Sequence, residues 1–437
     1  MSEVSALPDD IGRLSKLQTL VLELEELITL PDSITLVTTL QELSLENLFH
    51  LSSLPEDFGQ LIALQKLHLI NLGQLTGLPD SIGQLTTLRE LKVVDCRQLK
   101  QLPDTLSRLS SLEHLTIESC PGLKVLPDEM GSGMKRLRYL HLVHCSSLTH
   151  LPPSFSALTS LETLKIMRAK RFRGALLDGF CCLTSLKELV LQDMPRLAAL
   201  PASFSGVFSL TSLEIINCPK VPDFPEGIGR LEALEEVRIA RMDGLKRLPA
   251  SLVELPRVRV LEVRVCDGIG ALLGDEIVLK RTAKGSSHVR SLPESFSRLP
   301  KLQVLVVCAC QKLAHLPSSL WGMPTLREYD VSECPLLSRA DRRGFRARAG
   351  EEDDEEEEEE GVAVGEGEEE GGEEEEAEGE EGTEVAVEGE EAEREAEEED
   401  AESDGEDWNI HHEYGFDSED DRDDDYGGWG ASDEDEE

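Results

Sequence analysis

The sequence of 437 residues has few aromatic residues and no long apolar run. Aromatic side chains make up 4% of it, so any core must be built from aliphatic side chains. No run of about 18 apolar residues occurs, which argues against a membrane-spanning helix. The N-terminus lacks the basic and apolar regions of a secretory signal, and no Asn-x-Ser/Thr sequon is present. We therefore expect a cytoplasmic protein, with a nuclear location left open.

Motifs of nucleotide binding and of hydrolytic catalysis are also lacking. The sequence contains no GxxxxGK[ST] loop, no GxGxxG after a predicted strand and no GxSxG. These are the patterns that cradle phosphates or present a nucleophilic serine. The acidic residues include no pair isolated among apolar residues. We therefore predict a non-catalytic protein without a cofactor, a metal site or direct nucleic-acid binding.

Basic residues are nearly absent from the C-terminal part of the chain. Residues 350–437 contain 48 acidic and 2 basic residues, whereas residues 1–349 contain 40 acidic and 41 basic residues. A segment so rich in Glu and Gly cannot bury enough apolar surface to fold. We predict a disordered acidic tail at 350–437, joined by a basic linker at 339–349 to a body at 1–338. Ser403, Ser418 and Ser432 are each followed by acidic residues, which predicts phosphorylation by an acidophilic kinase.

The body is organised by a repeat of about 24 residues, the period of a leucine-rich repeat. The stretch from Leu99 to Cys120, LKQLPDTLSRLSSLEHLTIESC, shows its two halves. A Leu-Pro pair opens the first half. The second half follows LxxLxIxxC, whose apolar positions alternate as in a half-buried strand. The recognisable strand halves begin at Leu17, Leu40, Leu64, Leu88, Leu112, Leu137, Leu161, Leu186, Leu210, Leu234, Val258, Leu302 and Leu326.

Stacking of these 13 rungs predicts an α/β leucine-rich repeat solenoid, curved into a horseshoe. Parallel strands line its concave face, and short helical or 3₁₀ segments that begin near each proline cover the convex face. The first rung begins at Ala6-Leu7-Pro8 without a polar cap, so we expect a cap or a further domain upstream. One irregular rung is expected near residues 274–288, either as a degenerate rung with a solvated loop or as a protruding basic loop.

Cysteines recur at one position of the repeat, directly after the strand. We predict that they form a ladder of buried, reduced thiols, because a spacing of 24 or 25 residues is unlike the close pairs of zinc sites. Cys308 falls on an outward strand position instead, which predicts an exposed thiol. The cysteines at the repeated position are Cys96, Cys120, Cys145, Cys218, Cys266, Cys310 and Cys334.

The outward strand positions predict the binding surface. Their charge is mildly basic toward the middle rungs, although acidic residues are interspersed. We predict that a protein ligand, or the acidic tail of the chain itself, binds this face; an ordinary solvated surface is the alternative. His114, His141 and His144 fall near Cys145, where we expect solvated side chains rather than a metal site. The candidate binding residues are Lys66, His68, Arg89, Lys92, His114, Arg138, His141, Lys165, Arg168, Lys187, Arg238, Arg241 and Arg264.

The rung from Leu75 to Cys96, LTGLPDSIGQLTTLRELKVVDC, resembles the leucine-rich repeats of plant intracellular NLR disease-resistance proteins. The resemblance covers roughly residues 5–338. It implies recognition of pathogen effectors or guarded host proteins in innate immunity. The NB-ARC nucleotide-binding domain of that family is not found in this sequence, and we expect it upstream if the chain acts as a receptor.

The acidic tail supports a different interpretation. Repeats followed by such a tail resemble the acidic leucine-rich nuclear phosphoproteins, which bind histones. The alternative function is therefore that of a nuclear, histone-binding or chaperone-like protein, whose partners are basic proteins.

Overall fold

The computed structural model describes residues 5–338, except for residues 177–178, 246–247, 265–295, 297, 311–312 and 314. The chain divides into two units, Met1–Glu356 and Glu357–Glu437, and all described residues belong to the first. The predicted linker, tail and kinase sites lie outside the described residues. So does the predicted irregular rung near 274–288.

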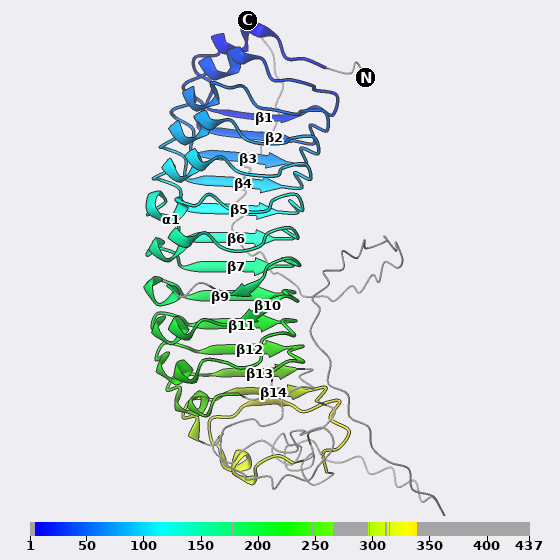
Figure 1. Ribbon diagram of the computed structural model, residues 1–437, viewed down its shortest axis with the longest axis vertical. Coiled ribbons are helices and arrows are strands. Elements are labelled where there is room, and N and C mark those ends of the chain that lie inside the picture. The colour runs from blue at the N-terminus through cyan, green and yellow to red at the C-terminus, as the bar shows by residue number, and fades with distance from the viewer. Residues whose placement is uncertain are drawn as a thin grey trace, which may run out of the picture. The chain divides into compact units, whose positions relative to one another are not determined.

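The first unit is a stack of rungs, each made of one strand and one short 3₁₀ segment (Figure 1). Thirteen strands form one parallel sheet in the order β1-β2-β3-β4-β5-β6-β7-β9-β11-β12-β13-β14-β15. Their bounds are β1 Thr19–Glu23, β2 Glu42–Glu46, β3 Lys66–Ile70, β4 Glu90–Val94, β5 His114–Glu118, β6 Tyr139–Val143, β7 Thr163–Met167, β9 Glu188–Gln192, β11 Ser212–Ile216, β12 Glu236–Ala240, β13 Val260–Arg264, β14 Val304–Cys308 and β15 Glu328–Asp330.

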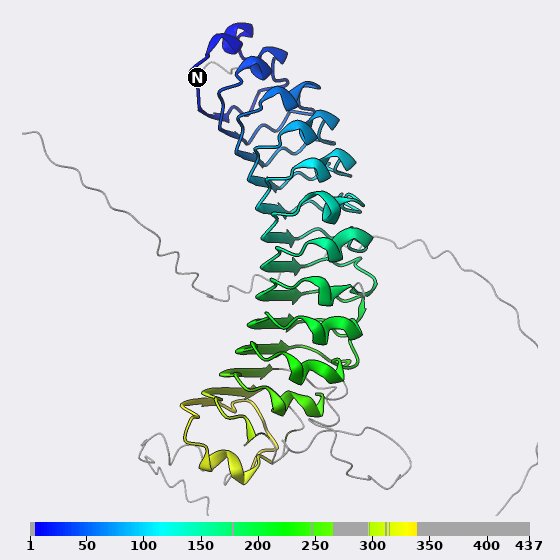
Figure 2. The ribbon, with the colours of Figure 1, turned by 90° about the vertical axis from the view of Figure 1, so that its left-hand side faces the viewer.

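The strands lie on one side of the stack and the 3₁₀ segments on the other, and the stack bends toward the strands (Figure 2). This arrangement confirms the predicted solenoid with its parallel sheet on the concave face. The second side holds 3₁₀ segments η1 Asp9–Arg13, η2 Asp32–Leu36, η3 Phe58–Gln60, η4 Asp80–Gln84, η5 Asp104–Arg108, η6 Pro153–Ala157, η7 Phe180–Cys182, η8 Ala202–Gly206, η9 Glu226–Arg230, η10 Ala250–Glu254 and η12 Ser318–Gly322. It also holds helix α1 (Met130–Gly133) and a small parallel pair, β8 (Gly174–Ala175) with β10 (Leu197–Ala199).

The core lies between these two sides and is almost wholly aliphatic. In each five-residue strand two apolar residues point inward, such as Leu115 and Ile117 on β5, which are at most 1% exposed. The 3₁₀ side also supplies buried side chains to the core, and there Phe155, Phe180 and Phe204 stack on successive rungs. Their ring centroids are separated by 6.5 and 6.2 Å. A rung therefore buries its apolar surface against its two neighbours rather than within itself.

A left-handed backbone residue ends most strands. Among the described residues, eleven non-glycine residues with φ between 52° and 57° occupy this position. In ten of them the backbone N–H donates to a carbonyl of the following rung at 2.8–3.0 Å, which extends the sheet hydrogen bonds beyond the strands. They form a row across the rungs, which we call the turn row: Asn47, Asn71, Asp95, Ser119, His144, Arg168, Asp193, Asn217, Arg241, Ala309 and Glu333.

Rung length varies by one residue without disturbing the sheet. Turn-row residues are 24 positions apart in most rungs, but 25 apart between Ser119 and His144 and between Arg168 and Asp193. The first of these longer rungs contains α1, whose Gly133 and Met134 N–H groups donate to carbonyls four residues back. The extra residue thus widens a 3₁₀ turn into an α turn, while β5 and β6 remain in unbroken register.

Five of the predicted ladder cysteines are buried and Cys310 is half-buried, whereas Cys266 lies outside the described residues. Cys96, Cys120, Cys145 and Cys218 are fully buried and are not in disulfides. Their thiols donate to carbonyls of their own and the preceding rung at 3.3–3.9 Å. The prediction for Cys308 is wrong, because this residue is only 9% exposed although it pairs in register with Arg264.

Candidate functional site

Three outward positions on each strand form three rows along the concave face. The first and third positions counted along each strand carry mostly charged or polar side chains. The fifth position is different, because apolar residues recur there and all of them are half-buried. We call this set the apolar row: Ile70, Val94, Val143, Met167, Ile216 and Ala240. Glu118 and Gln192 interrupt it at β5 and β9.

Eight predicted binding residues lie on outward strand positions, and five do not. The strands begin two residues after the leucine that opens each predicted strand half, so Arg89, Arg138 and Lys187 precede β4, β6 and β9. Arg168 and Arg241 follow β7 and β12 and belong to the turn row. The prediction that these five are strand residues is therefore wrong. Those on strands are Lys66, His68, Lys92, His114, His141, Lys165, Arg238 and Arg264.

Most of the predicted basic residues pair with an acidic residue of a neighbouring rung. Lys66 contacts Glu42 at 3.0 Å, and Lys165 contacts Glu188 at 3.0 Å. His68 lies 2.9 Å from Glu90, and Arg238 lies 2.8 Å from Glu236 and 3.6 Å from Glu262. The concave face is therefore a lattice of ion pairs rather than a stripe of positive charge. Arg89, Lys92 and Arg241 take part in no such pair among the described residues.

Glu162 joins two of these basic residues across three rungs. Its carboxylate accepts from Arg138 at 2.6 Å and from Lys187 at 2.7 Å. These two hydrogen bonds lower the pKa of Glu162, and the bond from Lys187 has the larger effect. Arg138 also lies over the ring of Tyr139, at 5.7 Å from its centroid, and Tyr139 stacks on His114 at 4.4 Å.

The three histidines that the sequence placed together occupy different positions along their rungs. His114 stacks at the start of β5, His141 is half-buried in the middle of β6, and His144 lies on the turn row. Cys145 points away from all three into the core. In the described ranges, no three His, Cys, Asp or Glu side chains are placed to hold a metal ion.

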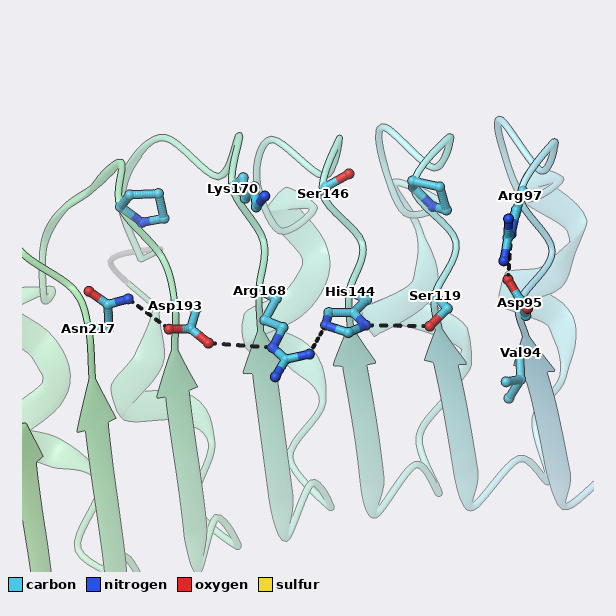
Figure 3. Close-up of a pocket in the computed structure, with 12 residues that line it drawn as sticks. Val94, Asp95, Arg97, Ser119, His144, Ser146, Arg168, Lys170, Asp193 and Asn217 are labelled. Carbon is cyan, nitrogen blue, oxygen red and sulfur yellow. Dashed lines mark hydrogen bonds and ion pairs between the residues drawn. The ribbon is translucent and has the colours of Figure 1, made fainter. Parts of the chain in front are cut away.

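A groove of about 850 Å³ runs along the turn row, beside the apolar row (Figure 3). It spans six strands, from β4 to β11. Charged side chains of both signs line it, together with apolar surface from Val94 and two prolines. Its lining residues are Val94, Asp95, Arg97, Ser119, Pro121, His144, Ser146, Arg168, Lys170, Asp193, Pro195 and Asn217.

Polar side chains on the floor of the groove form one connected chain (Figure 3). Asn217 donates to Asp193 at 2.8 Å, Asp193 pairs with Arg168 at 3.6 Å, and the Arg168 guanidinium donates to His144 Nε2. Because Nε2 accepts, Nδ1 carries the ring proton and faces Ser119 Oγ at 3.5 Å. Five successive turn-row side chains are thus held in fixed positions.

Burial and positive neighbours favour the neutral form of His141 and His144. Burial and then Arg168 lower the pKa of His144, and burial and then Lys165 lower the pKa of His141. A neutral His144 is what the contact with Arg168 requires, since a protonated ring has no lone pair to offer. Burial acts in the opposite direction on the carboxyl of Glu214, and raises its pKa.

Sequence reasoning singled out Arg168 but did not recognise the groove as a site. The groove could have been recognised from one repeat position, the residue directly before the inward cysteine or before the apolar residue that replaces this cysteine in other rungs. Asn, Asp and His are frequent there, and these types adopt the left-handed conformation more readily than most. That position, read down the repeats, gives the turn row.

Comparisons with known proteins match part of the chain. Residues 110–169 match the family model of R13L1/DRL21 LRRs. The disease resistance protein RPP5 of Arabidopsis thaliana is 30% identical over 123 residues, which span 27% of this chain and 8% of that protein. The solenoid is a leucine-rich repeat domain that resembles those of plant NLR disease-resistance proteins. The chain thus spans less than a tenth of the length of this relative.

Solved structures of leucine-rich repeat proteins were also compared with this domain. An LRR protein of Leptospira interrogans is 23% identical with a TM-score of 0.48, covering 79% of this chain and 91% of that one. The leucine-rich repeat domain of the type III effector XopL is 26% identical with a TM-score of 0.41, covering 59% and 78%. In the part of the chain that is described, no helix has the length and apolar character needed to cross a membrane.

Proposed function

We propose that this leucine-rich repeat domain is a non-catalytic module that binds a protein ligand along the turn-row groove and the apolar row. The observation that supports this proposal is the groove itself, where Val94 of the apolar row and two prolines adjoin a row of hydrogen-bonded polar groups. Apolar contact area supplies affinity, and fixed donors and acceptors supply specificity without the cost of ordering them.

The dimensions of the groove suit an extended segment of a partner. Six parallel strands at a spacing of ~4.8 Å span roughly 24 Å. An extended chain rises ~3.4 Å per residue, so about seven residues cover that length. Every second side chain of the bound segment would contact Val94, Val143 and Met167. The backbone of this segment would face the turn row.

The biological role that we propose is recognition of a ligand or pathogen effector in plant-type defence. The partial similarity to RPP5 and to the R13L1/DRL21 repeats supports it. A cytoplasmic location, with access to the nucleus, fits the same proposal.

A matched pair of valine substitutions tests the site. Val143 lies half-buried in the apolar row, whereas Val125 is 41% exposed away from the strands. Full-length wild-type protein, Val143→Glu and Val125→Glu are each used to capture partners from leaf extract, and candidates are then measured with purified components. A ligand of this site should lose at least about tenfold in affinity with Val143→Glu, equivalent to ~1.4 kcal/mol, and nothing with Val125→Glu. Equal binding to all three proteins would refute the site.

The sequence of residues 350–437 favours a second candidate, binding of histones or other basic proteins. It is tested with purified core histones and the chain with or without these residues. Tail-mediated binding should disappear with the deletion and weaken steeply with salt. Docking of the tail on the concave face finds less support, because Lys66, Lys165, Arg138 and Lys187 already have acidic partners.

A further inference from the structure

Two adjacent cysteines stand apart from the thiols that build the core. Cys181 and Cys182 are both exposed, whereas the other cysteines in the described residues are buried or half-buried. They end η7, one of the 3₁₀ segments, which lie on the side of the solenoid opposite the strands (Figure 2). The packing that explains the inward cysteines therefore does not explain this pair.

The local fold fixes the pair in place. Phe180 precedes it on the same 3₁₀ turn and is buried between Phe155 and Phe204. With that ring held inside, the next two side chains must leave toward solvent. The following rung packs directly against Cys181, since a Cβ on Gly206 would lie 2.6 Å from the Cys181 Cβ.

Neighbouring rungs show that the fold does not need thiols here. The residues after Phe155 are Ser156 and Ala157, and those after Phe204 are Ser205 and Gly206. Small side chains therefore suffice at both positions.

Adjacent cysteines suit a bridging atom better than a direct disulfide. Their Cα atoms are ~3.8 Å apart across a trans peptide, whereas unstrained disulfides need roughly 4.4–6.8 Å. A large atom bound by both sulfurs adds the missing reach. The neighbouring Cys181 raises the pKa of Cys182, so the Cys182 thiol must lose its proton when a soft centre binds. Two sulfurs are too few for structural zinc, which takes four ligands, but soft thiolates select Cu(I).

We propose that Cys181 and Cys182 form a bidentate dithiol site for a soft, thiophilic centre, either Cu(I) or trivalent arsenic. With hydrated phenylarsine oxide, two As–S bonds form and two As–OH bonds break. Each thiol proton leaves with a hydroxide as water, and no electrons are exchanged. With Cu(I), the ion binds both sulfurs and two protons are released to solvent.

The experiment uses the reduced, full-length protein under native conditions. Phenylarsine oxide is added with excess glutathione, which removes arsenic held by one thiol only, and intact mass is measured. A parallel titration lets the protein compete with a coloured Cu(I) chelator. We expect one phenylarsenic adduct per chain, or withdrawal of one Cu(I) from the chelator, and the two arms show which centre the site prefers.

Variants that copy the neighbouring rung provide the control. The variants are Cys181→Ser, Cys182→Ala and the two combined. The double variant reproduces the Ser156-Ala157 pair, and each single variant introduces one residue of that pair. Each should weaken retention by at least about a hundredfold, the gain that a second linked contact gives. Cys308→Ser should retain binding. Failure of wild type to hold either centre, or binding that persists in the double variant, would overturn the proposal.

Discussion

Replacement of Phe180 by alanine tests the phenylalanine stack that carries the exposed dithiol. The Phe180 side chain is 1% exposed, and its ring contacts those of Phe155 and Phe204. Truncation of a buried phenylalanine costs about 3–5 kcal/mol through lost burial and the cavity left behind. The two ring contacts, worth ~0.5–1.5 kcal/mol each, place Phe180→Ala in the upper part of that range. Phe180→Leu should cost only about 1–1.5 kcal/mol, because Leu106 fills the same position three rungs earlier.

Phe208 provides the matched control, since the same ring is 61% exposed there. Phe208→Ala should change the free energy of unfolding by less than ~0.5 kcal/mol. Urea unfolding followed by circular dichroism measures the total. Because a rung contacts only its neighbours, backbone hydrogen exchange should accelerate in β7, β9 and β11 but not in β3. Equal costs for Phe180→Ala and Phe208→Ala, or acceleration spread evenly over the sheet, would refute this reasoning.

Three further predictions concern the rows and the rung spacing. The pKa values of His141 and His144 are lowered in the folded protein, so the unfolded chain binds more protons near pH 6. The free energy of unfolding should therefore fall as pH drops below 6.5 and then level off. Replacing both histidines by Gln should flatten this part of the curve when the urea midpoint is measured at a series of pH values. Glu162→Gln should cost about 0.5–1 kcal/mol at pH 7, and because the pKa of Glu162 is lowered from 4.5, the difference from wild type should vanish only as pH falls well below that value. Gly131→Ala should destabilise the fold by at least ~1–3 kcal/mol, because a Cβ at this position would lie 1.7 Å from a backbone oxygen of the next rung. Gly77→Ala is the control: no atom lies within 4 Å of its Cβ, so it should not lower the melting temperature.

The repeat could be predicted from the sequence because its signal is carried by burial. Leu112, Leu115 and Ile117 must face the core whatever the neighbouring rungs contain, so a single rung already reveals the pattern. Strand ends were predicted less accurately, since they depend on hydrogen bonds between rungs. Arg138 illustrates this: it carries the polarity of an outward strand residue but lies before β6.

The groove could not be predicted because it depends on distances between rungs. His144, Arg168 and Asp193 are 24 or 25 residues apart, and no local pattern indicates that their side chains touch. The same holds for Glu162, whose role follows from having one basic residue before it and one after it in the stack. Charge counted along the sequence predicted a mildly basic surface, but it could not show that most of these basic residues pair with acidic residues across rungs.

The one-residue difference in rung length separates two kinds of change that this chain can accept. An insertion on the α1 side alters one turn and leaves every strand residue facing as before. An insertion within a strand would reverse its faces, sending charged side chains into the core. Related chains can therefore gain or lose residues behind the sheet, or duplicate whole rungs, while the groove keeps its geometry. Substitutions along the turn row and the apolar row can then diversify recognition independently of the length of the protein.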